Sequence, residues 1–247
     1  TFRQPILDRL AVCADWQLDF TFHKPSTCFH GGTFFSAIGE QFDALHRSEC
    51  VINADVLDAW FPPSPKVIAA LQEYLPWLLR TSPPNDASGL IATIAKVRNV
   101  PAASILPGAG SSDLIFRAFR HWLTPRSRVL ILDPIYSEYP HILERVIGCN
   151  VERFELRRDE NYDINLEALR SKISEGFDLA VLVNPNSPTG RHVSKDGMAT
   201  LLREIPATTR VWIDETYIEY LGTDQSLEPF AARSRNVIVC KSMSKVY

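Results

Sequence analysis

The chain has 247 residues, a formal net charge of −3 and an apolar fraction of 45%. This length suits one large α/β domain, or a large and a small one, and the composition is ordinary for a soluble globular protein. The slight acidity and the lack of a Lys/Arg cluster argue against nucleic acid as a partner, and no apolar stretch reaches membrane-spanning length. The five cysteines include no CxxC pair, which favours reduced thiols in the cytoplasm over a disulfide framework or a zinc site.

The first 65 residues are the least regular part of the sequence. Apolar residues in the range 6–20 have partly helical spacing, and residues 28–32 are typical of a loop. Ser64-Pro65-Lys66 predicts the start of an amphipathic helix, and a second helix is expected over Ala87–Val97. We therefore divide the chain into an N-terminal segment, residues 1–65, and one larger domain, residues 66–247.

From residue 112 onward, helical patterns alternate with short apolar runs. The runs predict strands at Arg128–Leu132, Val151–Phe154, Leu179–Val183, Val211–Ile213 and Val237–Cys240. Helices are expected at Ser112–Trp122, Ser137–Ile147, Asn165–Ile173 and Ser194–Ile205. This alternation indicates βα units, and hence a three-layer α/β fold whose mostly parallel sheet is covered by helices on both faces.

Polar and glycine-rich segments follow the apolar runs. In open α/β sheets, ligands bind beyond the carboxyl ends of the strands, so loops at these ends are candidates for one common site. The segments concerned are Gly108–Ser112, Asp133–Tyr136, Asn184–Gly190, Asp214–Tyr217 and the turn that carries Lys245.

The segment Gly108–Ser112 opens a predicted helix, where free amide groups and serine hydroxyls can bind an anion. The same residues would also serve as a simple glycine turn with a serine cap. A dinucleotide fold is a third reading, because Asp133 lies about twenty residues further on, as a ribose-binding acid would. Against that reading, Asp113 stands where the third glycine of the dinucleotide motif is expected.

Four side chains at the strand ends could act on an aromatic cofactor. Asp214 could pair with a pyridinium nitrogen, or serve as a helix cap. Tyr217 could donate to a ring oxygen and Tyr136 could stack on the ring, although both could be ordinary half-buried aromatics. Lys245, between hydroxyl groups after a buried strand, could form a Schiff base with a carbonyl beside a bound phosphate, or lie on the surface.

In this order and spacing, the segments resemble the class I/II aminotransferases, pyridoxal-phosphate enzymes of fold type I. Within that family the sequence is most similar to the histidinol-phosphate aminotransferases and the threonine-phosphate decarboxylases. Six strings carry the resemblance: Ser64–Val67, Gly108–Asp113, Asp133–Tyr139, Asn184–Gly190, Asp214–Glu219 and Ser242–Lys245.

The resemblance implies pyridoxal 5′-phosphate as cofactor and a role for each matching residue. Lys245 would be the catalytic residue, which forms the Schiff base and later moves the proton at the substrate Cα. Asp214 would bind the ring nitrogen, Tyr217 the ring oxygen, and Tyr136 would stack on the ring. The phosphate would be held by Gly110, Ser111, Ser112, Ser242 and Ser244. Residues 66–247 would then be the cofactor-binding large domain, and residues 1–65 would contribute to the small domain and cover the active site.

Three features depart from the family pattern. The asparagine that usually bonds the ring oxygen is Ser187 here, and either Ser187 or Asn186 could take over that contact. The segment Ala59–Pro65 replaces an N-terminal motif that lies near the substrate in relatives, which leaves the substrate open. The family continues with an arginine near the phosphate and a small C-terminal domain, so we expect further residues after Tyr247 for a complete site.

The leading hypothesis is an aminotransferase of amino-acid biosynthesis that exchanges an amino group between an amino acid or amine, possibly phosphorylated, and a 2-oxo acid. An alternative is a decarboxylase of a phosphorylated amino acid, for which His30-Gly31-Gly32 is a matching string. A non-catalytic cofactor-binding module is a third hypothesis. The resemblance also implies a homodimer, and the apolar segments 60–63 and 74–79 could form its surface.

Overall fold

The computed structural model describes residues 32–39, 44–59 and 61–246 in two units, Thr1–Asp58 and Ala59–Tyr247. In the first unit, helix α2 (Thr33–Ile38) is followed by the 3-10 helix η1 (Leu45–Glu49). The Phe34 amide donates to Asp55 Oδ2 at 3.3 Å. The helical pattern at residues 6–20 and most of the loop at 28–32 lie outside the described residues, and the functional division at residue 65 stays a prediction.

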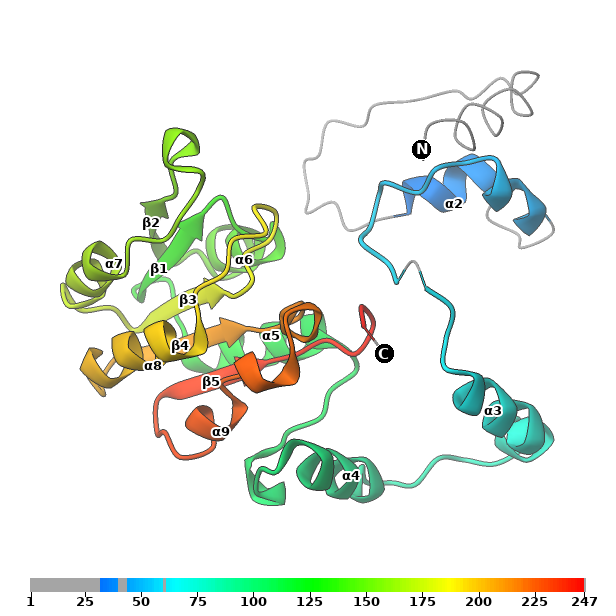
Figure 1. The fold of residues 1–247 in the computed structure, drawn as a ribbon. Coiled ribbons are helices and arrows are strands. Elements are labelled where there is room, and N and C mark those ends of the chain that lie inside the picture. Colours follow the sequence, from blue (N-terminus) through cyan, green and yellow to red (C-terminus); the bar gives the residue numbers. More distant parts are fainter. Residues whose placement is uncertain (1–31, 40–43, 60, 247) are drawn as a thin grey trace. The chain divides into compact units, whose positions relative to one another are not determined.

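The second unit contains a parallel sheet of five strands (Figure 1). They are β1 (Arg128–Asp133), β2 (Asn150–Glu155), β3 (Leu179–Val183), β4 (Arg210–Asp214) and β5 (Val237–Cys240). The order is β2-β1-β3-β4-β5, and every neighbouring pair is parallel. All five predicted strands are confirmed, with ends that differ by at most one residue.

Burial explains why these strands were readable as apolar runs. All five residues of β3 are buried, as are the four central residues of β1, because helices cover both faces of the sheet. The edge strand β2 has no fully buried residue, and its charged residues are half-buried (Glu152) or exposed (Arg153 and Glu155). The core is therefore centred on the inner strands, whose carboxyl ends are held in fixed register.

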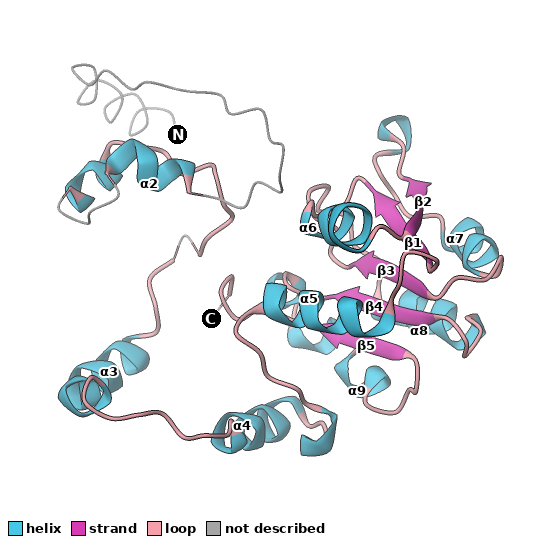
Figure 2. Ribbon diagram, turned by 180° about the vertical axis from the view of Figure 1, so that it is seen from behind, coloured by secondary structure: helices cyan, strands magenta, loops and turns pink. Residues whose placement is uncertain are grey.

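Helices lie on both faces of the sheet, as predicted (Figure 2). On one face, α5 (Ser111–Trp122) packs beside the helix formed by α6 (Glu138–Pro140) and η3 (His141–Ile147). On the other face, α7 (Leu166–Ile173) packs beside α8 (Lys195–Glu204). Two predicted helix starts, Asn165 and Ser194, are N-caps whose side chains accept amide hydrogen bonds at 3.0 and 3.3 Å.

The predicted helix at Ser137–Ile147 differs in its hydrogen bonding. It begins as a short α-turn and continues as a π-helix from His141 to Ile147. Pro140 has no amide hydrogen and cannot continue the regular α-helical pattern, which accounts for an interruption at this point. Near the end of the segment, the amide of Gly148 donates to the carbonyl of Leu143 at 3.0 Å, five residues back.

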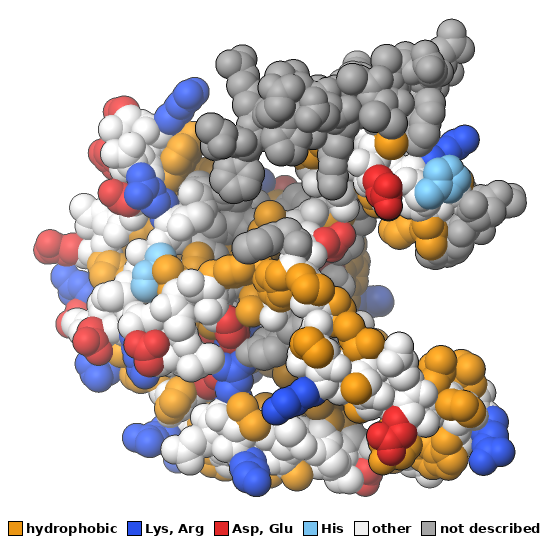
Figure 3. Space-filling view, turned by 45° about the vertical axis from the view of Figure 1, so that its right-hand side comes forward, with side chains coloured by type: hydrophobic (Ala, Val, Ile, Leu, Met, Phe, Trp, Pro, Cys, Tyr) orange, Lys and Arg blue, Asp and Glu red, His pale blue; other side chains and the backbone are white. Residues whose placement is uncertain are grey.

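Two predicted helices precede the sheet. These are α3 (Pro65–Leu78), with proline at its first position, and α4 (Ser88–Arg98). No residue of α3 is buried, and the predicted apolar face is exposed, with Leu71 at 51% and Leu75 at 47%. Figure 3 shows apolar side chains gathered on one part of the molecular surface.

Short helices complete the described part of the chain. They are η2 (Ala102–Ser104), η4 (Arg158–Glu160), η5 (Ile218–Tyr220), η6 (Thr223–Gln225) and α9 (Glu228–Ala231). Sequence periodicity did not predict them because each is only three or four residues long. Among the residues that are described, no helix combines the length and the apolar character needed to cross a membrane.

Candidate active site

The strand order places a topological switch point between β1 and β3. The connection after β1 leads outward to β2, and the next one returns past β1 to β3. At such a point the loops diverge and leave room for a ligand beyond the strand ends. The candidate residues follow the carboxyl ends of β1, β3, β4 and β5, while Gly110–Ser112 form the start of α5.

The glycine-serine turn has the backbone form of an anion-binding helix start. Gly110 is the N-cap of α5 with φ 93° and ψ 165°, a left-handed conformation that favours glycine, and it offers no side-chain cap. Ser111 and Ser112 occupy the first turn of this 12-residue helix. The Asp113 carboxylate accepts from the Ala109 amide at 3.1 Å and from Arg117 Nε at 2.6 Å. The Arg117 hydrogen bond lowers the pKa of Asp113. A carboxylate therefore lies beside this turn, where a dinucleotide-binding motif would have its third glycine.

Two predicted cofactor contacts converge on Glu138, to which the sequence analysis gave no role. The Ser112 hydroxyl donates to Glu138 Oε2 at 2.9 Å, and the Tyr136 hydroxyl donates to the same oxygen at 2.7 Å. Glu138 is only 7% exposed. A carboxylate at the start of a predicted helix was the only sequence signal for this role. It did not reveal the contact, because the partner Ser112 lies 26 residues away in the sequence.

Asp214, the last residue of β4, is a buried carboxylate with two donors. Tyr139 Oη donates to Oδ2 at 2.7 Å, and the Thr216 amide donates to Oδ1 at 2.9 Å. Trp212 Nε1 in turn donates to Tyr139 Oη at 3.0 Å. Burial raises the pKa of Asp214, and the hydrogen bonds from Thr216 and Tyr139 act against this rise. A buried carboxylate is strongly stabilised by a neighbouring cation, so this site favours a positively charged partner.

The loop after β3 is fixed by its asparagines. Asn184 exchanges two hydrogen bonds with the backbone of Val193, at 2.8 and 2.9 Å. The Asn186 amide nitrogen donates to the Pro134 carbonyl and to Thr189 Oγ1, both at 3.0 Å. Both Asn186 amide hydrogens are thus engaged, and its buried Oδ1 has no hydrogen-bond partner among the described residues. Ser187, the other candidate for a ring-oxygen contact, is half-buried.

The turn that carries Lys245 leaves the strand next to Asp214. Asp214 pairs in register with Cys240, and Lys245 follows five residues later. The Ser242 and Ser244 hydroxyls lie 2.8 Å apart. Tyr220 Oη donates to the Lys245 carbonyl at 3.3 Å, and the Tyr220 ring stacks on Tyr217 with a centroid distance of 6.5 Å.

These contacts link five of the predicted residues in two groups. In the first, Glu138 joins Ser112 to Tyr136, whose ring lies edge-on to Tyr139 at 6.0 Å, and Tyr139 reaches Asp214. In the second, Tyr217 is connected to Lys245 through Tyr220. Both groups include residues at the end of β4. Asp214 is the last residue of that strand, and Tyr217 follows it by three positions.

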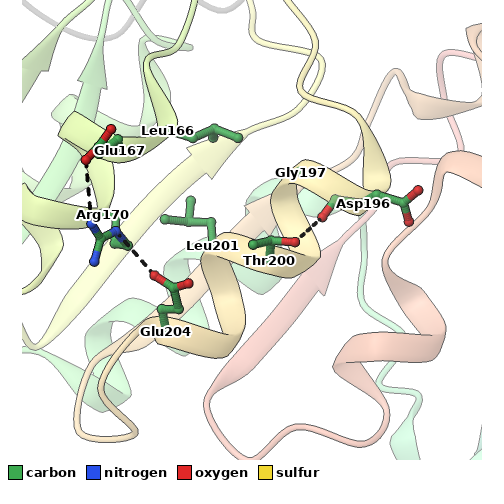
Figure 4. A pocket seen from close by; sticks show the side chains of 8 residues that line it. All are labelled: Leu166, Glu167, Arg170, Asp196, Gly197, Thr200, Leu201 and Glu204. Atoms are coloured by element: carbon green, nitrogen blue, oxygen red, sulfur yellow. Dashed lines mark hydrogen bonds and ion pairs between the residues drawn. The ribbon is translucent and has the colours of Figure 1, made fainter.

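A separate depression lies between α7 and α8 (Figure 4). Arg170 forms ion pairs there with Glu204 at 3.3 Å and with Glu167 at 4.0 Å, and Thr200 donates to the Asp196 carbonyl. The depression belongs to the helical layer rather than to the strand ends, and its arginine already pairs with two glutamates. It is a poor candidate for the catalytic site.

Comparison with known proteins adds to this geometry. Residues 55–247 match the model of the family described as aminotransferase class I and II. The histidinol-phosphate aminotransferase of Staphylococcus saprophyticus is 31% identical over 192 residues, which cover 76% of this chain and 52% of that protein. The chain spans about half the length of the curated relatives it matches.

Solved structures show the same fold. A proposed histidinol-phosphate aminotransferase from Erwinia carotovora atroseptica aligns with a TM-score of 0.67 and 27% identity, covering 76% of this chain and 55% of that one. The histidinol-phosphate aminotransferase from Sinorhizobium meliloti, solved in complex with pyridoxal-5′-phosphate, aligns with a TM-score of 0.68 and 21% identity, covering 93% and 60%. The family match extends over most of the chain and includes every strand of the sheet, and the chain therefore belongs to the class I and II aminotransferases.

Proposed function

We propose that the protein is a pyridoxal-phosphate-dependent aminotransferase that exchanges an amino group between an amino acid or amine and a 2-oxo acid. The observation that carries this proposal is the buried Asp214 carboxylate at the end of β4, held by Tyr139 and Thr216. The strand beside it leads directly to Lys245. Membership in the family supports the same reaction class.

The described residues fit this cofactor. The first turn of α5 offers amide groups, a helix dipole and two serine hydroxyls to a phosphate dianion. The buried Asp214 carboxylate suits a protonated ring nitrogen, and Lys245 supplies an amine for covalent attachment. When bound, pyridoxal phosphate supplies an electron sink that stabilises a carbanion at the substrate Cα.

The chain's own residues would divide the remaining work. Lys245 would hold the cofactor covalently and then carry the proton to and from the substrate Cα. Tyr136 would stack on the ring, and Tyr217 and Ser187 would donate to its oxygen. The phosphate would be bound by Gly110, Ser111, Ser112, Ser242 and Ser244. For Ser112 this requires a rotation of its hydroxyl away from Glu138, to which it donates in this structure.

Amine transfer and decarboxylation are separated by their products. The full-length protein, loaded with pyridoxal phosphate, is given histidinol phosphate or an amino acid together with 2-oxoglutarate, and glutamate is measured. The name of the relative makes histidinol phosphate the first amine to test. In parallel, release of CO2 is measured from phosphorylated amino acids. Glutamate formation supports the proposal, CO2 release without glutamate supports the decarboxylase, and cofactor binding without either product indicates a non-catalytic module.

We also propose that the protein forms a homodimer through α3. Eight apolar side chains in and just after this helix are at least 40% exposed: Val67, Ile68, Leu71, Tyr74, Leu75, Trp77, Leu78 and Leu79. An apolar patch of this kind on a folded protein commonly marks an interaction surface. Family resemblance makes a second copy of the chain the partner that we expect.

The double substitution Leu71→Glu with Leu75→Glu should therefore halve the molar mass in light scattering at micromolar concentration. Both residues lie on one face of α3, four positions apart, so the change places two charges in the proposed contact. A matched control introduces glutamate at Leu106 and Val146 instead. These side chains are 79% and 43% exposed elsewhere in the same unit, so the molar mass should stay unchanged. A dimer that survives the α3 change would show that the contact lies elsewhere.

The proposal includes a cytoplasmic location. Cys149 and Cys240, two of the cysteines within the described ranges, are free thiols. Burial raises the pKa of the Cys240 thiol far above its usual value, which keeps it inert towards oxidation. Thiol titration of the purified, unfolded protein without reductant should detect all five cysteines of the chain, and a disulfide would argue for an oxidising compartment.

A further inference from the structure

Five charged side chains meet at the exit of β5. Lys241 is the first residue after the strand, and its Nζ lies 2.5 Å from Glu219, 3.7 Å from Glu215 and 3.9 Å from Glu228. Arg98, the last residue of α4, reaches Glu219 at 2.7 Å and Glu228 at 3.8 Å. The cluster therefore joins α4, the segment after β4, the start of α9 and the beginning of the turn that carries Lys245.

This cluster is unusually well shielded from water. The Glu215 side chain is 0% exposed and Glu219 6%, while Arg98 and Lys241 are 9% and 14% exposed. In the surface pair of Arg157 and Asp159, by comparison, both side chains are more than half exposed. Removing charges from water costs more than an average ion pair returns, so stability alone is a weak explanation for the cluster. A requirement for defined geometry explains it better.

Glu215 is the fixed point of the cluster. Its carboxylate accepts from the Ser226 hydroxyl at 2.6 Å and from the Leu227 amide at 2.7 Å. Its own amide donates to the Cys240 carbonyl at 2.8 Å. Lys241, by contrast, makes no contact with hydrogen-bond geometry at Nζ within the described part of the chain and is held by charge. The lysine thus sits against acceptors whose positions are already set.

The segment Asp214–Tyr220 has two sets of side chains with different partners. Asp214 and Tyr217 are the residues that the proposed function assigns to the cofactor ring. Glu215 and Glu219 hold Lys241, and Tyr220 donates to the carbonyl of Lys245. One short piece of chain is therefore connected both to the ring site and to the two ends of the turn Lys241–Lys245.

We propose that Lys241 is a positioning residue, which anchors the start of the turn Lys241–Lys245 on Glu215 and Glu219 and so places the Lys245 amine. The inference rests on the proposed function of Lys245. A turn of five residues without its first anchor could shift by several ångströms, since each residue spans up to about 3.5 Å. A displacement of about 1 Å at a reacting group can cost about 10²-fold in rate.

The test compares three variants of the full-length protein loaded with pyridoxal phosphate. Lys241→Met removes the charge but keeps a long unbranched side chain, and Lys241→Arg keeps the charge. Lys172→Met is the matched control, because Lys172 also pairs with two glutamates, Glu152 at 2.8 Å and Glu175 at 2.7 Å, in a different part of the sheet domain. The readouts are the visible absorption band of the bound cofactor and its pH midpoint, cofactor affinity, kcat, KM and Tm.

Lys241→Met should shift the pH midpoint of the band and lower kcat by about 10- to 100-fold, with a smaller change in KM. Lys241→Arg should recover most of both properties, and Lys172→Met should match the wild type. If Lys241→Met lowers Tm but leaves the band, its pH midpoint and kcat unchanged, the residue is only structural and the proposal is overturned.

A second variant keeps the proposal testable if Lys241→Met does not fold. Tyr220→Phe removes the hydrogen bond to the Lys245 carbonyl at the other end of the turn, and it should shift the same band in a milder way. If the band of the Tyr220→Phe variant does not shift, the proposal is overturned. A wild-type protein that gives no cofactor band would instead refute the proposed function itself, so the two failures are distinguishable.

Discussion

Lys245→Ala is expected to abolish the visible absorption band of the bound cofactor and to reduce turnover by at least about 10³-fold. The reason is that this one amine provides both the covalent link and the proton carrier at Cα, and general acid–base catalysis alone contributes about 10²- to 10⁴-fold. Absorption spectra of the loaded protein and steady-state rates of glutamate formation measure the two effects.

The fold should survive this substitution. Lys245 is half-buried in a turn beyond the last strand, so its side chain contributes little to the core. We expect circular dichroism and the Tm of the cofactor-free protein to change only slightly. Lys195→Ala is a suitable control, because Lys195 is also half-buried and donates to the Asp224 carbonyl on the surface. A variant that lacks Lys245 but retains the band and full turnover would show that another amine holds the cofactor.

The sheet was predictable because its strands are parallel and covered on both faces. Such strands consist almost entirely of apolar residues, and Leu179–Val183 is an example in which all five are buried. The helices were predictable where a capping residue marks the start, as at Asn165 and Ser194. The position of the candidate site followed from the same pattern, because polar residues come directly after the apolar runs.

The contacts within the site could not be read from the sequence. Glu138 bonds Ser112 across 26 positions, and Tyr139 bonds Asp214 across 75. Such pairs depend on which helix lies over which strand, information that local periodicity does not contain. The same holds for Arg98, whose ion pair with Glu219 spans 121 positions. Roles within the cofactor site came from family resemblance and remain proposals.

Glu138 shows why the structure changes the interpretation of the phosphate site. A buried carboxylate at the start of α6 accepts hydrogen bonds from the hydroxyl groups of Ser112 and Tyr136. Its charge also opposes ionisation of Asp214. A phosphate that binds at α5 competes for the Ser112 hydroxyl. Ser111 and the backbone amides of the first turn would then form the primary anion contacts, with Ser112 as an exchangeable one.

Asp214→Asn is expected to weaken cofactor affinity and to lower kcat by about 10³-fold, equivalent to about 4 kcal/mol. Asparagine keeps the shape of the side chain and can still accept from Tyr139, but it has no negative charge to keep the ring nitrogen protonated. Equilibrium titration of the cofactor-free protein with pyridoxal phosphate measures affinity, and single-turnover kinetics measures the chemical step.

A second substitution separates the effect of the Asp214 charge from the effect of its position. Tyr139→Phe removes the 2.7 Å hydrogen bond to Asp214 but leaves the carboxylate in place. Hydrogen bonds to charged groups contribute about 1.5–3 kcal/mol, so affinity should fall by about 10- to 150-fold. The structure predicts that this effect is smaller than that of Asp214→Asn, because the charge itself remains. Unchanged kinetics in Asp214→Asn would remove this residue from the mechanism. Equal losses in both variants would mean that the orientation of the carboxylate matters more than its charge.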